Sequence, residues 1–192
     1  MNDGTLHVLA MAGSLRRASF NRGLVRAARD LAMPGIDLEI FDLAPLPLFN
    51  EDVRAAGPPD SVRLLKAAVA RADALLIATP EYNYSVPGVL KNAIDWASRP
   101  PNDTPLPGKP AAIVGASNGG FGTVRSQLHL RQVLQGVGVL CMSRPELMVS
   151  QADTKFDADG NLTDDAVRQS LRKVLEGLAA WTRRLARSTS PA

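Results

Sequence analysis

Short apolar segments alternate along this chain with longer amphipathic stretches, and this alternation constrains the fold more than any other feature. It is typical of βαβ units, in which helices cover both faces of a parallel sheet. Strand-length segments lie at residues 6–12, 37–41, 74–79 and 111–116, and a fifth strand is expected somewhere within 139–148. The segment 74–79 is nearly all apolar, as a strand buried on both faces should be.

Five helices are expected between and after these strands. They are predicted at residues 20–31, 60–72, 88–97 and 123–135, and a last helix begins at 163–165, where polar and acidic residues suit an N-terminus. Asp60 or Ser61 is expected to cap the second of these helices, and four prolines between 45 and 59 predict a long loop before it. The sequence therefore predicts an α/β fold, a three-layer sandwich around a five-stranded parallel sheet.

The length and composition indicate one domain. The chain has 192 residues, of which 45% are hydrophobic and 21% charged, which is enough for one continuous core. We expect a single domain over residues 1–187 and a disordered tail at 188–192. The 22 basic and 19 acidic residues are scattered and give a net charge of +3, so no nucleic-acid partner is expected.

The sequence favours a soluble protein of a reducing compartment. Cys141 is the single cysteine, so we expect neither a disulfide framework nor a metal site, and its apolar surroundings favour a small buried residue over a redox thiol. Residues 6–12 lack the basic flank and the length of a signal peptide, and no apolar segment is long enough to cross a bilayer. We therefore expect a cytoplasmic protein with no membrane partner.

Polar loops follow the first, third and fourth predicted strands, at residues 13–21, 80–87 and 117–122. In an open parallel sheet, ligands bind beyond the carboxyl ends of the strands, where the strand order reverses. With the strand order 2-1-3-4-5, these loops share one edge of the sheet. We therefore expect them to form one binding site.

The first loop is suited to a phosphate group. It offers the hydroxyls of Ser14 and Ser19, the guanidinium of Arg16 and the amide of Asn21, directly before a predicted helix. Backbone N–H groups and the helix dipole favour an anion at such a place, and an arginine adds a charge-assisted hydrogen bond. The alternative is an ordinary turn in which Ser19 only caps the helix.

The second loop is suited to a flat heteroaromatic ring. Tyr82 and Tyr84 flank the amide of Asn83, and prolines at 80 and 87 stiffen the backbone. Aromatic side chains can pack against such a ring while an amide binds its edge. A surface turn with exposed tyrosines is equally compatible with this loop taken alone.

Glycines at 119, 120 and 122 in the third loop permit close approach of a ligand to the main chain. The loop is not a P-loop, because Phe121 stands where that motif has lysine. No GxGxxG follows the first strand either, which disfavours a classical dinucleotide-binding domain.

Residues 115–119 match the GxSxG pattern of a hydrolase nucleophile elbow around Ser117. A catalytic triad of that kind also needs an acid and then a histidine later in the chain. The only histidine after Ser117 is His129, in the next predicted helix, and His7 precedes it in the first strand. A serine hydrolase is therefore a minor alternative.

The three loops together give the chain a resemblance to the NADPH-dependent FMN reductase family, in particular its flavodoxin-like quinone, chromate and azo-compound reductases. The segment Gly13-Ser14-Leu15-Arg16, with Ser19 and Asn21, resembles the phosphate loop of that family. The longer stretch from Pro80 to Trp96 resembles the family signature. The resemblance covers nearly the whole chain and implies a flavodoxin-like fold.

This resemblance implies an enzyme that binds FMN and takes a hydride from NADPH or NADH by a ping-pong mechanism. No side chain is expected to be catalytic, because the flavin supplies the chemistry. The acceptor would be a quinone, chromate, an azo compound or free flavin, and the family implies a homodimer or homotetramer. A flavin-binding electron carrier without substantial NAD(P)H turnover is the alternative. The implied FMN contacts are Ser14, Arg16, Ser19 and Asn21 for the phosphate, Pro80, Glu81, Tyr82 and Asn83 for the ring and ribityl chain, and Ser117, Gly119 and Gly120 on the other side.

Overall fold

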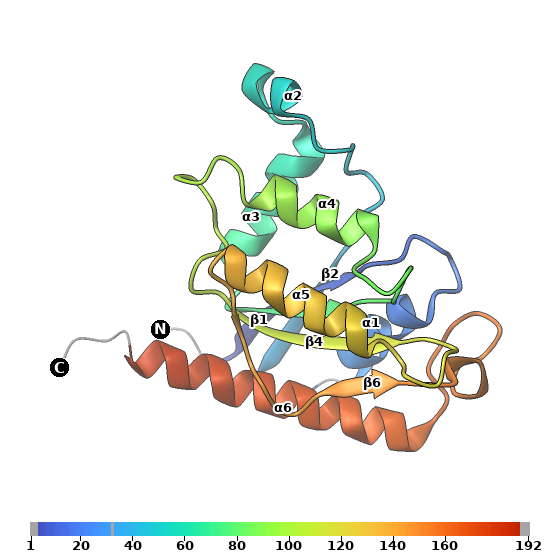
Figure 1. Ribbon diagram of the computed structural model, residues 1–192. Helices are drawn as coiled ribbons and strands as arrows, with labels where there is room; N and C mark the ends of the chain where they lie inside the picture. The colour runs from blue at the N-terminus through green and yellow to red at the C-terminus, as the bar shows by residue number, and fades with distance from the viewer. Residues whose placement is uncertain (1–3, 32, 189–192) are drawn as a thin grey trace.

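A parallel β-sheet forms the centre of the computed structural model, which describes residues 4–31 and 33–188 (Figure 1). The strands are β1 (Leu6–Ala12), β2 (Ile36–Phe41), β3 (Ala74–Ala78), β4 (Pro110–Ala116), β5 (Leu140–Cys141) and β6 (Leu147–Val149). Their order is β2-β1-β3-β4-β5, with β6 also paired to β4, and every pair is parallel. The predicted order 2-1-3-4-5 and the flavodoxin-like α/β fold are confirmed.

Helices cover both faces of this sheet. Figure 1 shows α6 on one side and α3, α4 and α5 on the other. The helices are α1 (Phe20–Asp30), α2 (Glu51–Ala56), α3 (Asp60–Arg71), α4 (Gly88–Ala97), α5 (Val124–Gly136) and α6 (Asp165–Ser188), with a 3-10 turn at Ala152–Thr154. The predicted three-layer arrangement is therefore correct.

The alternation of side chains along each strand produces two separate cores. In β1, for example, Val8 and Ala10 belong to the core beneath α1 and α6, whereas Leu9 and Met11 belong to the core beneath α3, α4 and α5. Because successive strand residues point to opposite faces, a strand covered on both sides must be apolar throughout. This accounts for β3, in which all five residues are buried.

The fifth strand position differs from the prediction of one continuous strand. Two short strands share the edge beside β4: β5 pairs with Pro110 and Ala111, and β6 pairs with residues 114–116. Pro145 lies between them and has no N–H to donate, so the ladder is interrupted there. Cys141 lies in β5, where burial raises the pKa of its thiol to about 11. The thiol is thus protonated at neutral pH, although the residue is half-buried and not fully buried as expected.

Two local predictions before α3 were wrong. The segment predicted as loop contains α2, which is capped by the Asn50 side chain through a 2.8 Å bond from the Asp52 backbone N–H. Neither Asp60 nor Ser61 caps α3; Pro59 occupies that position, and the Asp60 carboxylate pairs with Arg63 instead. Since α2 has no buried residue, no apolar periodicity could reveal it in the sequence.

The last helix begins as predicted, because the Asp164 carboxylate accepts a 2.8 Å bond from the Val167 N–H. The helix includes Ser188, the first residue of the expected tail, and residues 189–192 lie outside the described residues. Among the residues that the structure describes, no helix is long and apolar enough to cross a membrane.

Candidate active site

The loops after β1, β3 and β4 meet at the carboxyl edge of the sheet and enclose a pocket of about 260 Å³. Eight of the predicted site residues line it: Ser14, Arg16, Ser19, Asn21, Pro80, Glu81, Tyr82 and Ser117. Asn83, Gly119 and Gly120 belong to the same loops but do not line the pocket. Phe20, Ala116 and Asn118 do line it and were not predicted. Only their place beside predicted residues could have pointed to them.

The first loop presents hydroxyls and a guanidinium at the N-terminus of α1. Ser19 is the N-cap and accepts a 3.3 Å bond from the Arg22 N–H. Ser14 is buried, and its Oγ accepts a 3.4 Å bond from the Arg16 N–H. The Arg16 side chain is exposed and lies over the Phe20 ring, with Cζ 5.1 Å from the ring centroid. Ser14, Arg16 and Ser19 therefore line the same pocket at the N-terminus of α1.

The close contact between the first and second loops explains why residue 13 is a glycine. A Cβ atom at Gly13 would lie 2.8 Å from Cγ of Pro87 and 3.2 Å from Cδ of Pro80. Real Cβ atoms essentially never show a contact as short as the one to Pro87, so glycine at this position allows the loops to approach. The Tyr82 hydroxyl also joins them, donating to Ser14 Oγ over 3.3 Å.

Asn21 connects the first loop to the third. Its amide nitrogen donates to the Ala116 carbonyl over 2.9 Å, and its amide oxygen accepts from the Ala116 N–H over 3.0 Å. All of these atoms are buried, so the pair satisfies backbone groups at the end of β4 that would otherwise have no partner. Asn21 thus holds two loops of the pocket together; contact with a phosphate stays a prediction.

The second loop is a tight turn that displays two tyrosines. Tyr82 and Ser85 exchange backbone bonds of 3.1 and 3.0 Å, and the two residues between them have positive φ, 48° at Asn83 and 67° at Tyr84. This is the type I′ geometry. The rings are 51% exposed at Tyr82 and 67% at Tyr84, and Phe121 of the third loop is 73% exposed.

Glu81 is buried below this turn and caps α5. Its carboxylate accepts from the backbone N–H groups of Arg125 (3.0 Å) and Ser126 (3.2 Å), and it forms an ion pair with the Arg125 guanidinium. The hydrogen bond from the Arg125 guanidinium to the Glu81 carboxylate raises the pKa of Arg125 above its usual value. The guanidinium also lies 3.8 Å above the Tyr84 ring centroid. Glu81 therefore fixes the second loop to the helix that follows the third.

The third loop follows Gly115 and Ala116 of β4, which pack closely against the end of β3 and the start of α5. A Cβ atom at Gly115 would lie 2.0 Å from Thr123 Oγ1 and 2.4 Å from the Thr79 carbonyl, so glycine is required there by packing. Ser117 Oγ accepts a 3.2 Å bond from the Gly119 N–H. A Cβ atom at Gly120 would meet nothing within 4 Å, so that residue has open space in front of it.

The structure excludes the hydrolase triad around Ser117. His129 Nδ1 is bonded to Ser85 Oγ at 3.0 Å, and the two ring nitrogens of His7 face Asp37 and Glu39 at 3.1 Å each. Both histidines of the chain are described, and neither is bonded to Ser117. Within the GxSxG match, packing requires the first glycine, Gly115.

Comparison with known proteins identifies the family. Residues 6–154 match the family of NADPH-dependent FMN reductases. The chain belongs to this family. It is 51% identical over 180 residues to an NAD(P)H-dependent FMN reductase of Pseudomonas aeruginosa, covering 94% of this chain and 97% of that protein. An NADPH:quinone oxidoreductase of Arabidopsis thaliana is 46% identical, with 94% and 93% covered.

A solved structure supports the same assignment. The flavoenzyme NAD(P)H:(acceptor) oxidoreductase of Paracoccus denitrificans superimposes with a TM-score of 0.85 at 37% identity, covering 94% of this chain and 98% of that one. The predicted family, the FMN cofactor and the NAD(P)H dependence are therefore confirmed, and the protein is an oxidoreductase.

The pocket has the donors that FMN requires. Two hydroxyls, a guanidinium and a helix N-terminus form a set suited to a phosphate monoester. Pro80 and Tyr82 lie beside this set on the next loop and can face a flat ring. The residues present thus fit the cofactor of the family.

Proposed function

We propose that the protein reduces quinones, using FMN held in the three-loop pocket and NAD(P)H as the reductant. The observation that carries this proposal is the pocket itself, in which a loop suited to a phosphate and a tyrosine-bearing turn lie next to each other in a member of the FMN reductase family. Relatives named quinone oxidoreductase or quinone reductase favour a quinone as acceptor. Chromate, azo compounds and free flavin are the other acceptors to be tested.

The first loop is proposed to hold the phosphate of FMN. Ser14 and Ser19 supply hydroxyl donors, and the exposed Arg16 side chain can close over the phosphate without leaving Phe20. Asn21 contributes by keeping this loop against the end of β4. The arrangement makes Arg16 the residue whose loss weakens phosphate binding most, because it carries the only full positive charge among the predicted contacts.

The second and third loops are proposed to line the ring and ribityl chain. Pro80, Tyr82 and Asn83 come from one side, and Ser117, Gly119 and Gly120 from the other. Glu81 does so indirectly: its carboxylate binds backbone N–H groups at the start of α5 and so fixes the tyrosine turn. FMN, when bound, supplies the hydride chemistry, so these residues orient the ring and leave one face open.

An open face lets the reductant and the acceptor use the same space in turn. The exposed Tyr82 side chain lines the pocket, and the exposed Tyr84 and Phe121 side chains lie on the same two loops outside its lining; together they offer flat apolar surface to either molecule. Such a surface selects for planar shape more than for particular functional groups. A ping-pong cycle with broad acceptor tolerance follows.

We also propose that the protein acts in the cytoplasm as a homodimer or homotetramer, with one flavin-binding domain over residues 1–187. The exposed aromatic side chains beside the pocket support an interface there, since large exposed apolar groups gather at such surfaces. The single cysteine and its protonated thiol suit a reducing compartment.

The visible spectrum of the purified protein tests the function. Bound FMN should bleach on anaerobic addition of NADPH and recover when a quinone is added. Bleaching without turnover in steady state would instead indicate an electron carrier. A protein that is colourless and does not take up added FMN would refute the proposal.

A further inference from the structure

A cavity of about 540 Å³ lies at the amino edge of the sheet, opposite the edge that carries the three loops. This amino-edge cavity is about twice as large as the three-loop pocket and lies in the usual size range of small-molecule sites. Pro110, the first residue of β4, lines it, whereas Ala116, the last residue of β4, lines the three-loop pocket. Six residue steps of about 3.3 Å separate Pro110 from Ala116 by roughly 20 Å, so the two sites are distinct.

One wall of the amino-edge cavity is apolar and stiff. Pro105 and Pro107 come from the loop before β4, and Pro110 begins the strand. Leu6 and Leu140, the first residues of β1 and β5, also line the cavity, and Leu140 is 40% exposed, so a ligand can reach its side chain. Because proline fixes its own backbone angle, this wall needs little ordering when a ligand binds. It suits the apolar body of a small molecule.

The cavity also carries positive charge. Arg71, Lys109 and Arg183 line it, together with the carboxylate of Asp73. Arg71 is in addition paired at 3.0 Å with the Glu39 carboxylate. Three cations and two carboxylates leave a net charge of +1, which one monocarboxylate would neutralise. The charge of the lining therefore favours a monoanion over a phosphate dianion.

Lys109 places a half-buried ammonium group at this cavity. Its Nζ donates to the carbonyl oxygens of Ala72 (2.5 Å) and Ala70 (3.4 Å) at the C-terminal end of α3. Burial lowers the pKa of Lys109, and the negative charge of Asp73 acts in the opposite direction. Since an ammonium group has three N–H donors, one is left after these two bonds. An anion in the cavity would compensate part of the solvation that this charge has lost.

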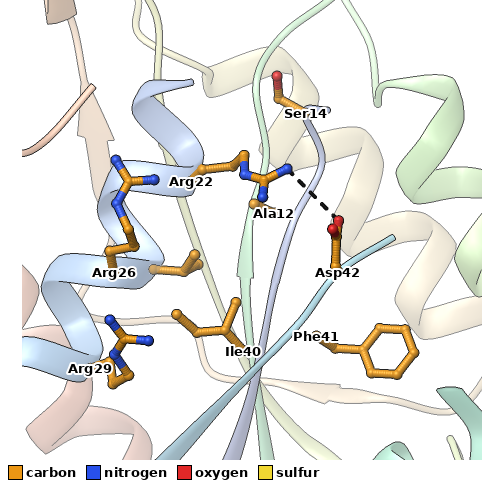
Figure 2. Close-up of a pocket in the computed structure, with 9 residues that line it drawn as sticks. Ala12, Ser14, Arg22, Arg26, Arg29, Ile40, Phe41 and Asp42 are labelled. Carbon is orange, nitrogen blue, oxygen red and sulfur yellow. Dashed lines mark ion pairs between the residues drawn. The ribbon is translucent and has the colours of Figure 1, made fainter. Parts of the chain in front are cut away.

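Arg183 differs from the other arginines that line a groove of this molecule. Figure 2 shows the groove beside α1, where Arg22 is paired with Asp42, and Arg26 and Arg29 also have bonded partners. The Arg183 guanidinium is exposed, and within residues 4–31 and 33–188 it forms no hydrogen bond or ion pair. It can therefore bind an anion without giving up another partner.

We propose that the amino-edge cavity binds a small organic acid. The carboxylate lies toward Arg183 and Lys109, and the apolar body lies along the prolines and leucines of the wall. The two oxygens of a carboxylate match the planar donors of a guanidinium group, which makes this anion a suitable partner for Arg183. The inference does not depend on the proposed function, because the cavity and the three-loop pocket lie at opposite edges of the sheet.

Calorimetry of the FMN-loaded protein with octanoate as the probe tests this inference. Octan-1-ol is the matched neutral compound, and acetate is the matched anion without an apolar body. Octanoate should bind about tenfold more tightly than either of them, because it alone uses both the cations and the wall. Equal affinity for octanoate and octan-1-ol would overturn the proposal, and so would equal affinity for octanoate and acetate.

Variants of the lining locate the binding. Arg183→Gln should lower the affinity for octanoate by about tenfold and leave the affinity for octan-1-ol unchanged. Arg29→Gln is the matched control, because Arg29 is also an exposed helical arginine and lies outside the cavity lining. Leu140→Asn should weaken octanoate and octan-1-ol alike, since it alters only the wall. Lys109 is less suitable for substitution, because it also holds the end of α3.

Two results would contradict the assignment. Unchanged octanoate affinity in Arg183→Gln would show that the acid does not bind at the amino-edge cavity. Displacement of octanoate by a quinone would place the acid at the three-loop pocket instead. The rate of quinone reduction should be the same in Arg183→Gln and in the wild type, so a failure of this inference and a failure of the proposed function give different results.

Discussion

The loop after β1 and the loop after β3 are held in place in the same way, although by different residues. Each has one buried polar side chain that is bonded to the backbone of another element, and each presents neighbouring side chains to the pocket. Asn21 is that residue in the first loop and Glu81 in the second. Arg16 and Tyr82, by contrast, are exposed at the pocket.

The difference between the two loops lies in charge. Asn21 is neutral and binds both polar groups of one residue, Ala116. Glu81 is charged, and its partners are the first turn of α5 and the Arg125 guanidinium. Removal of a buried charge partner costs more than removal of a neutral one. We therefore expect the second loop to be the more sensitive to substitution.

The largest effect is expected for Glu81→Ala. The side chain is only 6% exposed and accepts two backbone bonds from the first turn of α5, so its loss should lower the free energy of unfolding by about 4 kcal/mol. The ion pair adds little to this loss, because the Arg125 side chain is 36% exposed. Urea denaturation measures this. The control is Asp60→Ala, which removes an exposed pair at the start of α3 and should cost less than about 1 kcal/mol. Equal losses in the two variants would show that Glu81 does not fix the loop.

The next largest loss in the free energy of unfolding is expected for Asn21→Ala. It leaves a buried N–H and a buried C=O of Ala116 without their partners, at about 1–3 kcal/mol each, so we expect a total near 3 kcal/mol. Asn50→Ala is the control, because Asn50 also accepts a backbone bond but is exposed at the start of α2. Its loss should cost about 1 kcal/mol. If Asn21→Ala unfolds at the same urea concentration as the control, the Ala116 bonds contribute nothing.

The sequence predicted the fold well where burial controls the pattern. Strands buried on both faces are continuous apolar runs, so β1 and β3 could be found within one residue of their ends. The short β5 and β6 could not be separated, because each has too few residues to show a pattern. The helix α2 was missed because it has no buried residue and therefore shows no apolar periodicity.

The residues of the site could be predicted, but the roles of some could not. Residue type pointed to Asn21 and the family resemblance to Glu81, and both line the pocket, yet their bonds reach partners 95 and 44 positions away along the chain. Local sequence carries no information about such partners.

Arg16→Ala should separate binding from stability in the first loop. We expect FMN affinity to fall by about 2 kcal/mol, or roughly 30-fold in Kd, because a charge-assisted bond to the phosphate is lost. Fluorescence titration of the FMN-free protein measures this. Arg17→Ala is the control, since Arg17 is also exposed and does not line the pocket. The urea midpoint of Arg16→Ala should stay near that of the wild type. Unchanged FMN affinity in this variant would refute the phosphate role.

Tyr82→Phe should give the smallest effect and tests whether the second loop acts on the first. The hydroxyl donates to Ser14 over 3.3 Å, a long bond that leaves Ser14 oriented toward the pocket. Its loss should weaken FMN binding by about 0.5–1 kcal/mol, a few-fold in Kd, with the ring contact retained. Tyr84→Phe is the control, because the Tyr84 ring stacks on Arg125 and lies outside the pocket lining. If both variants bind FMN like the wild type, the two loops act on the cofactor independently. A loss in Tyr82→Phe alone would mean that the tyrosine turn also positions the phosphate loop.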